Sequence, residues 1–149
     1  EGLKQKEGYC PCRLERKPEF KCICEEFEKA GAKVCVIDIA DNPCFVGDIG
    51  DEATLRRFAE KVIEEYGRVD CLINNAPPLF KGINECTYEE FNYALRVGVS
   101  ATFLLTQLFQ PYFAPGASII NISSSRDRMS MPGSESYTAL AEEFLKMQK

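Results

Sequence analysis

The sequence contains no histidine, so it lacks the side chain that most often serves as a general base or a metal ligand. It has no basic excess either, because 18 Lys and Arg are outnumbered by 23 Asp and Glu, for a net charge of −5. Nucleic acid is therefore not an expected partner. No apolar stretch approaches the roughly 20 residues of a membrane span, and the first residues contain no signal-peptide core. We expect a cytoplasmic protein that binds no membrane.

Cysteine, in contrast, is abundant, with eight among 149 residues. Four of them form two C-x-C pairs: Cys10 with Cys12, and Cys22 with Cys24. Such pairs suggest a zinc site, but the second pair falls on a predicted helix, where residues two apart point to different faces. This disfavours a metal site. We expect Cys35 and Cys71 to be small buried hydrophobes within strands, and we expect no disulfide framework in the cytoplasm.

The first half of the chain alternates between helical and strand-like patterns. Apolar residues spaced i, i+3, i+4 and i+7 from Phe20 predict a helix that ends at Gly31. Residues 33–39 are expected to form a strand that ends in Asp38. Its continuous apolar run at 34–37 is typical of a parallel strand covered on both faces. A shorter strand is expected at 44–46, and an amphipathic helix at 51–66 that stops at Gly67.

The second half continues this alternation. An apolar run at 69–73 breaks at Asn74-Asn75-Ala76, which predicts a buried strand that opens into a polar loop. A capping box at 87–90 starts a helix that runs to about Pro111. That helix is apolar nearly all round, so we expect it to be buried on more than one side. A buried strand at 117–122 and a final helix from Tyr137 complete the pattern.

Helices that alternate with short apolar strands indicate an α/β fold with a parallel sheet and right-handed crossovers. Residues 1–18 show no periodicity and are expected to form an irregular N-terminal segment. Residues 19–149 are expected to form the domain.

Five sequence motifs, in order and spacing, resemble the short-chain dehydrogenase/reductase family over roughly residues 19–141. They are Glu28-Lys29-Ala30-Gly31-Ala32-Lys33-Val34, Asp38, Gly47-Asp48-Ile49, Asn74-Asn75-Ala76, and Ile120-Asn121-Ile122-Ser123-Ser124 followed by Tyr137. The resemblance implies a Rossmann-like parallel sheet with helices on both faces. It also implies an NAD-dependent oxidoreductase that acts on an alcohol or carbonyl substrate.

The resemblance assigns cofactor contacts to five residues. Asp38 would accept hydrogen bonds from the adenosine ribose, and its charge would favour NAD by repelling the 2′-phosphate of NADP. Asp48 and Ile49 would bracket the adenine. Asn74 and Ala76 would lie along the cofactor, although Pro77 replaces the glycine that usually follows.

The resemblance assigns catalysis to Ser124 and Tyr137, which are separated by the family's usual interval. The serine would hold the substrate oxygen and the tyrosine would exchange a proton with it. The family's lysine four residues after the tyrosine lowers the tyrosine pKa by its positive charge. Here that position is Ala141, and Gly98 replaces the asparagine of the central helix. Impaired or absent catalysis is therefore expected.

Both ends of the family pattern are altered. The glycine-rich phosphate loop would fall on residues 13–20, which contain no glycine, and no apolar strand precedes them. The strands at 34–39 and 69–73 would then have unpaired inner edges. No residues match the family's last strands or its substrate loop.

Two alternatives to an active enzyme follow. The chain could be a truncated, non-catalytic protein that forms homo-oligomers through helices 88–110 and 137–148. It could instead be a remnant with an altered reading frame, because the family signal begins abruptly near residue 20. Translating the upstream DNA in the other frames tests the second alternative.

Overall fold

The computed structural model describes residues 28–76, 81–123, 133, 135, 138 and 139. These residues fall in two compact units, residues 1–47 and 48–149, and each is described by itself. The helix predicted before Gly31 is seen only at its end, where the Gly31 N–H donates to the Glu28 carbonyl at 2.9 Å. Gly31 has a φ of 89°, a left-handed conformation that suits glycine at a helix end. The two C-x-C pairs lie outside the described residues.

The first unit contains two short parallel strands, β1 (Ile37–Asp38) and β2 (Phe45–Val46). Asn42 closes the connection between them. Its side-chain amide donates to the carbonyls of Ala40 and Phe45, each at 3.0 Å, and its oxygen accepts from the Phe45 N–H at 2.8 Å. This use of an asparagine side chain in place of backbone partners is typical of tight loops.

The predicted coverage of the first strand on both faces is wrong. β1 has two residues rather than seven, and the Ile39 side chain that follows it is 70% exposed. Cys35 is also not a free hydrophobe, because it forms a disulfide with Cys44 across a Cα–Cα distance of 5.7 Å. Within the described residues β1 pairs only with β2, so no other described strand pairs with its second edge.

In the second unit, helix α3 (Glu52–Tyr66) forms as the sequence predicts. The Asp51 carboxylate caps its first turn by accepting the Thr54 N–H at 3.0 Å. Gly67 ends it with a φ of 70°. Its apolar face is buried, with Leu55 3% and Ala59 2% exposed.

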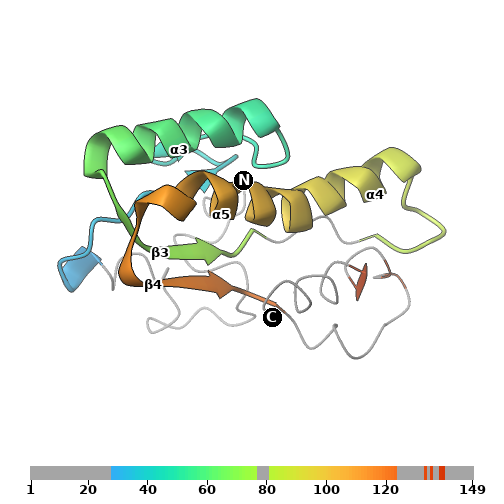
Figure 1. Cartoon of the computed structure of the whole chain (residues 1–149). Helices are drawn as coiled ribbons and strands as arrows, with labels where there is room; N and C mark the ends of the chain where they lie inside the picture. Colours follow the sequence, from blue (N-terminus) through green and yellow to red (C-terminus); the bar gives the residue numbers. More distant parts are fainter. Residues whose placement is uncertain (1–27, 77–80, 124–132, 134, 136–137, 140–149) are drawn as a thin grey trace. The chain divides into compact units, whose positions relative to one another are not determined.

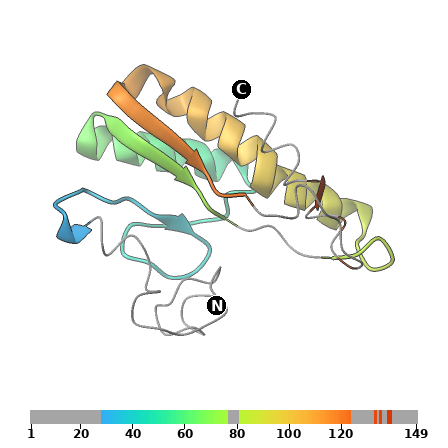
Figure 2. The same cartoon turned by 90° about the horizontal axis from the view of Figure 1, so that it is seen from below.

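The second sheet pairs β3 (Val69–Asn74) in parallel with β4 (Phe113–Asn121). The strands end together, with Asn74 opposite Asn121. Helices α3 and α5 (Ala101–Phe109) lie on the same side of this pair (Figures 1 and 2). Between the two helices, the Phe58 and Phe109 rings meet edge to face with centroids 6.3 Å apart, which gives the unit its core.

The predicted burial of both strands is wrong on the side away from these helices. Cys71 is exposed, and Ile73 and Ile120, which pair across the sheet, are 37% and 40% exposed. Helices α3 and α5 lie on the opposite side (Figures 1 and 2). The helix predicted from Tyr137 lies outside the described residues.

The long predicted helix is continuous but not uniform. It comprises α4 (Tyr88–Leu95), a π-helical stretch (Arg96–Ser100) and α5, and a 3₁₀ turn (Gln110–Tyr112) follows. The prediction that it is buried on more than one side is wrong for the single chain. Its buried side includes Ala94 (1% exposed) and Phe109 (2%), whereas Phe103 is 62% exposed.

Candidate active and cofactor site

Two predicted cofactor residues follow strands and share one local geometry. Asp38 is the last residue of β1, and its Oδ1 accepts the N–H of Ala40 at 2.8 Å. Asp48 follows β2, and its Oδ1 accepts the N–H of Gly50 at 2.7 Å. Each carboxylate is thus held by the backbone two residues later, as in an Asx turn. Within the described part of the chain, the second oxygen of neither carboxylate has a hydrogen bond.

Asp48 has a further partner that the sequence analysis missed. The Tyr93 hydroxyl on α4 donates to Asp48 Oδ1 at 2.9 Å. Burial and the adjacent Asp48 carboxylate raise the pKa of Tyr93, so its hydroxyl stays protonated and donates. Because 45 residues separate the two, no local pattern pointed to this contact. Ile49, like Asp48, is half-buried.

The ends of β3 and β4 are joined by an asparagine pair. The Asn74 side-chain nitrogen donates to Asn121 Oδ1 at 2.7 Å, and the Ile122 N–H donates to the Asn74 carbonyl at 2.9 Å. Beyond this pair, Ala76 is exposed. Parallel strands align their carboxyl ends, so pairing the two strand-ending asparagines by register would have revealed this contact.

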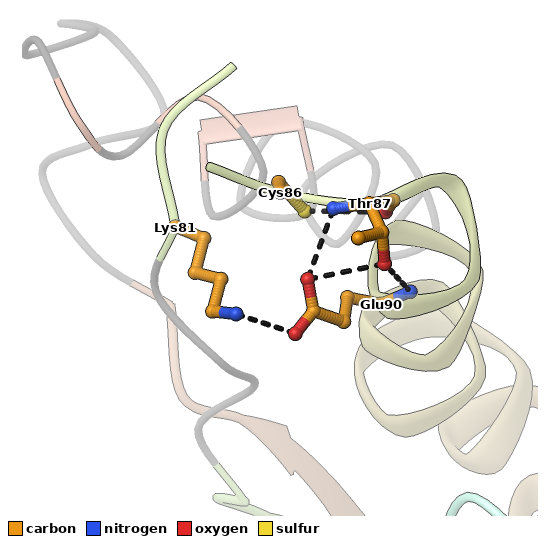
Figure 3. Close-up of polar contacts among 4 residues, drawn as sticks. All are labelled: Lys81, Cys86, Thr87 and Glu90. Carbon is orange, nitrogen blue, oxygen red and sulfur yellow. Dashed lines mark hydrogen bonds and ion pairs between the residues drawn. The ribbon is translucent and has the colours of Figure 1, made fainter. Parts of the chain in front are cut away.

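Just before α4, Lys81 forms an ion pair with Glu90 (Figure 3). Glu90 also completes the capping box, because its carboxylate accepts the Thr87 N–H at 2.9 Å while the Thr87 hydroxyl accepts the Glu90 N–H at 3.2 Å. The hydrogen bond from Lys81, followed by that from the Thr87 backbone, lowers the pKa of Glu90 to about 2. A cavity of about 220 Å³ adjoins this cluster and is lined mainly by apolar groups, among them Ile83 and Phe91.

The described residues contain neither of two other kinds of site. No group of three or more Cys, Asp or Glu side chains is arranged to hold a metal ion there. No helix there combines the length and the apolar character that crossing a bilayer requires.

Comparison with known proteins gives the family. A family model described as enoyl-(acyl carrier protein) reductase matches residues 21–141. The chain belongs to the short-chain dehydrogenase/reductase family. An apo SCOR enzyme from Clostridium thermocellum superposes with a TM-score of 0.78 at 37% identity, covering 84% of this chain and 57% of that one. The predicted family and the incomplete Rossmann-like α/β fold are thereby confirmed.

This short-chain dehydrogenase/reductase matches only part of the length of its other relatives. Sepiapterin reductase from Chlorobaculum tepidum is 36% identical over 74 residues, which are 49% of this chain and 30% of that protein. A blue fluorescent protein from a metagenomic library, solved in complex with NADPH, has a TM-score of 0.67 at 29% identity, covering 83% of this chain and 47% of that one. This chain spans half or less of the length of the curated relatives it matches.

The catalytic residues that the family pattern assigns, Ser124 and Tyr137, lie outside the described residues, as do positions 13–20 and Ala141. The last described residue before them, Ser123, has a buried hydroxyl without a hydrogen-bond partner in the structure. Gly98, at the asparagine position of the short-chain dehydrogenase/reductase pattern, lies at the centre of the π-helical stretch. Its carbonyl accepts the Thr102 hydroxyl at 3.3 Å.

Proposed function

We propose that this chain is the cofactor-binding part of a short-chain oxidoreductase that uses NAD and acts on an alcohol or carbonyl. Asp38 would hold the adenosine ribose, and Asp48 and Ile49 the adenine. Asn74 and Ala76 would lie along the cofactor, and Ser124 and Tyr137 would serve the substrate. Hydride transfer by the chain as written is proposed to be impaired, because Ala141 and Gly98 replace the lysine and asparagine of the family's proton path.

The observation that carries the proposal is the matched geometry of Asp38 and Asp48. Both carboxylates come at or just after the carboxyl end of a parallel strand, where ligands of open α/β sheets bind. In each carboxylate, one oxygen accepts a hydrogen bond from a backbone N–H. The second oxygen has no hydrogen bond in the described structure. A carboxylate that is fixed in place and has one oxygen without a donor among the described residues suits the hydroxyl and amino donors of adenosine.

In this proposal these residues serve the adenosine part of a dinucleotide. In the family pattern, residues 13–20 would bind the pyrophosphate. They contain no glycine, which the backbone needs in order to approach a phosphate closely. NAD supplies the hydride acceptor when it is bound. The chain's own contribution is to orient the adenosine and, through Ser124 and Tyr137, to hold the substrate oxygen and its proton.

Titration of the purified chain with NADH and with NADPH, followed by calorimetry, tests this proposal. We expect NADH to bind at least about ten-fold more tightly, because the Asp38 charge repels the 2′-phosphate of NADPH. The variant Asp38→Asn should bring the two affinities close together. Asp41→Asn, which removes the same charge from an exposed residue three positions later, is the matched control and should keep the preference. If neither dinucleotide binds at millimolar concentration, the proposal is wrong.

A second candidate function is homo-oligomerisation without catalysis, through the segment 88–110 and the helix predicted at 137–148. The observation that favours it is the 62% exposure of the Phe103 side chain on α5, whose opposite side is buried in the unit's core. A large exposed aromatic on an apolar helix is typical of a surface that a partner covers.

A further inference from the structure

The contact between Tyr93 and Asp48 does more than join two segments of the second unit. Asp48 Oδ1 receives two hydrogen bonds from different directions in the chain, one from the Gly50 N–H at 2.7 Å and one from the Tyr93 hydroxyl at 2.9 Å. A carboxylate with one oxygen held by two donors has little freedom to rotate. Its orientation is therefore set jointly by its own loop and by α4.

Tyr93 is itself held on both sides. A Cβ placed on Gly50 would lie 2.6 Å from Tyr93 Cε2, so the ring packs directly against the loop backbone. The Arg96 guanidinium lies over the ring, 5.6 Å from its centroid. Arg96 in turn pairs with Glu89 at 3.1 Å. The Tyr93 hydroxyl is thus a positioned donor rather than a mobile one.

The second oxygen of Asp48 is where a ligand donor fits. In the described structure this oxygen has no hydrogen bond, and the residue is only half-buried, so a ligand can reach it. A carboxylate accepts hydrogen bonds and donates none, so it favours an amino group over a carbonyl oxygen at the facing position of a ligand. Adenine carries an amino group at position 6, whereas hypoxanthine carries a carbonyl oxygen there.

We propose that Tyr93 is a positioning residue whose hydroxyl fixes the Asp48 carboxylate and thereby makes the chain prefer a 6-aminopurine to a 6-oxopurine. This inference rests on the proposed binding of a dinucleotide. It adds a residue from α4 to the recognition of the base. Without the hydroxyl, the carboxylate keeps only its own loop's hydrogen bond and can turn to accept from other donors.

The test compares the affinity of the chain for NADH with that for reduced nicotinamide hypoxanthine dinucleotide, measured by calorimetry. We expect the natural chain to prefer NADH and Tyr93→Phe to reduce that preference about five-fold, the effect of losing one hydrogen bond. Tyr88→Phe removes a hydroxyl from the same helix at a residue that is 82% exposed, and it should leave the preference unchanged.

A second variant reaches the same contact from the loop. Gly50→Ala places a methyl group against the Tyr93 ring and should displace its hydroxyl, so it should also reduce the preference for NADH. A merely structural role for Tyr93 would weaken the binding of both dinucleotides equally and leave their ratio intact.

The possible outcomes separate the two proposals. If the natural chain binds neither dinucleotide, the proposed function fails and this inference fails with it. If NADH binds but the preference is the same in Tyr93→Phe and in the natural chain, the role of Tyr93 is overturned and the proposed function stands. A preference that falls in Tyr93→Phe and Gly50→Ala, but not in Tyr88→Phe, supports the inference.

Discussion

Gly67 is a residue at which the local backbone conformation limits substitution. It ends α3 with a φ of 70°, and its N–H donates to the Ile63 carbonyl at 2.8 Å. A Cβ there would meet no atom within 4 Å, so the cost of a side chain comes from the backbone alone. We expect Gly67→Ala to lower the free energy of unfolding by about 1 kcal/mol, measured by urea denaturation.

Gly67→Asn is the matched control, because asparagine tolerates the left-handed region better than alanine does. It should lose less stability than Gly67→Ala. Equal stability of the alanine variant and the natural chain would show that the strain at this position is negligible.

The candidate site could be predicted from the sequence only in part. The family resemblance predicts Asp38 and Asp48 as site residues, but it does not predict the Asx turns that hold them. The bonds from Tyr93 to Asp48 and from Asn74 to Asn121 span 45 and 47 residues. The asparagine pair follows from the register of two parallel strands, whereas the Tyr93 contact depends on how α4 packs, which a sequence pattern does not contain.

At the scale of the element, α4 depends on its first turn. Glu90 accepts hydrogen bonds from Lys81 and from Thr87, which lower its pKa from 4.5 to about 2. A carboxylate whose folded pKa is depressed stabilises the fold above its unfolded pKa, and this stabilisation is lost as the pH falls towards the folded value. We therefore expect the free energy of unfolding to fall between about pH 4.5 and pH 2.

Glu90→Gln should remove the part of this pH dependence that Glu90 contributes, because glutamine does not titrate. Denaturation at a series of pH values would show a shallower slope below pH 4.5 than in the natural chain. Glu89→Gln is the control on the same turn, since Glu89 pairs with Arg96 rather than with the capping box. An identical slope in Glu90→Gln and the natural chain would contradict the assignment.

Whole elements were predicted well when their signals lay within one stretch of sequence. The limits of α3 and the capping box of α4 are of this kind. The burial of the strands was predicted poorly, because it depends on which other helices and strands pack against them. An apolar run such as β3 indicates a strand, but it does not say which side of that strand the described helices cover.

At the scale of the molecule, the described part of the second unit is a layer of helices on one side of a two-stranded parallel sheet (Figure 1). The chain covers 57% of the Clostridium thermocellum structure it resembles and half or less of its curated relatives. Ile120 on β4, which pairs with Ile73 on β3, is exposed on the side of the sheet on which the described residues place no helix. Exposed apolar surface of this kind is typical of a surface that contacts another protein segment or a partner.

Phe103 gives the sharpest test of association between copies of the chain. If two copies pair through the segment 88–110, the exposed Phe103 ring is buried in that contact, and Phe103→Ser removes most of its apolar area. We expect sedimentation equilibrium to show a dimer for the natural chain and a monomer for the variant. Because Phe103 makes little contact within its own unit, the urea midpoint measured at low concentration should change little.

Ile83→Ser is the matched control for lost surface hydrophobicity, because Ile83 is 78% exposed but precedes α4. It should leave the dimer intact. A natural chain that stays monomeric at every concentration would exclude self-association, and a Phe103→Ser variant that remains dimeric would place the interface elsewhere. Either result would leave the binding of NADH as a separate question, since Asp38 and Asp48 do not depend on a second copy for the hydrogen bonds that hold them.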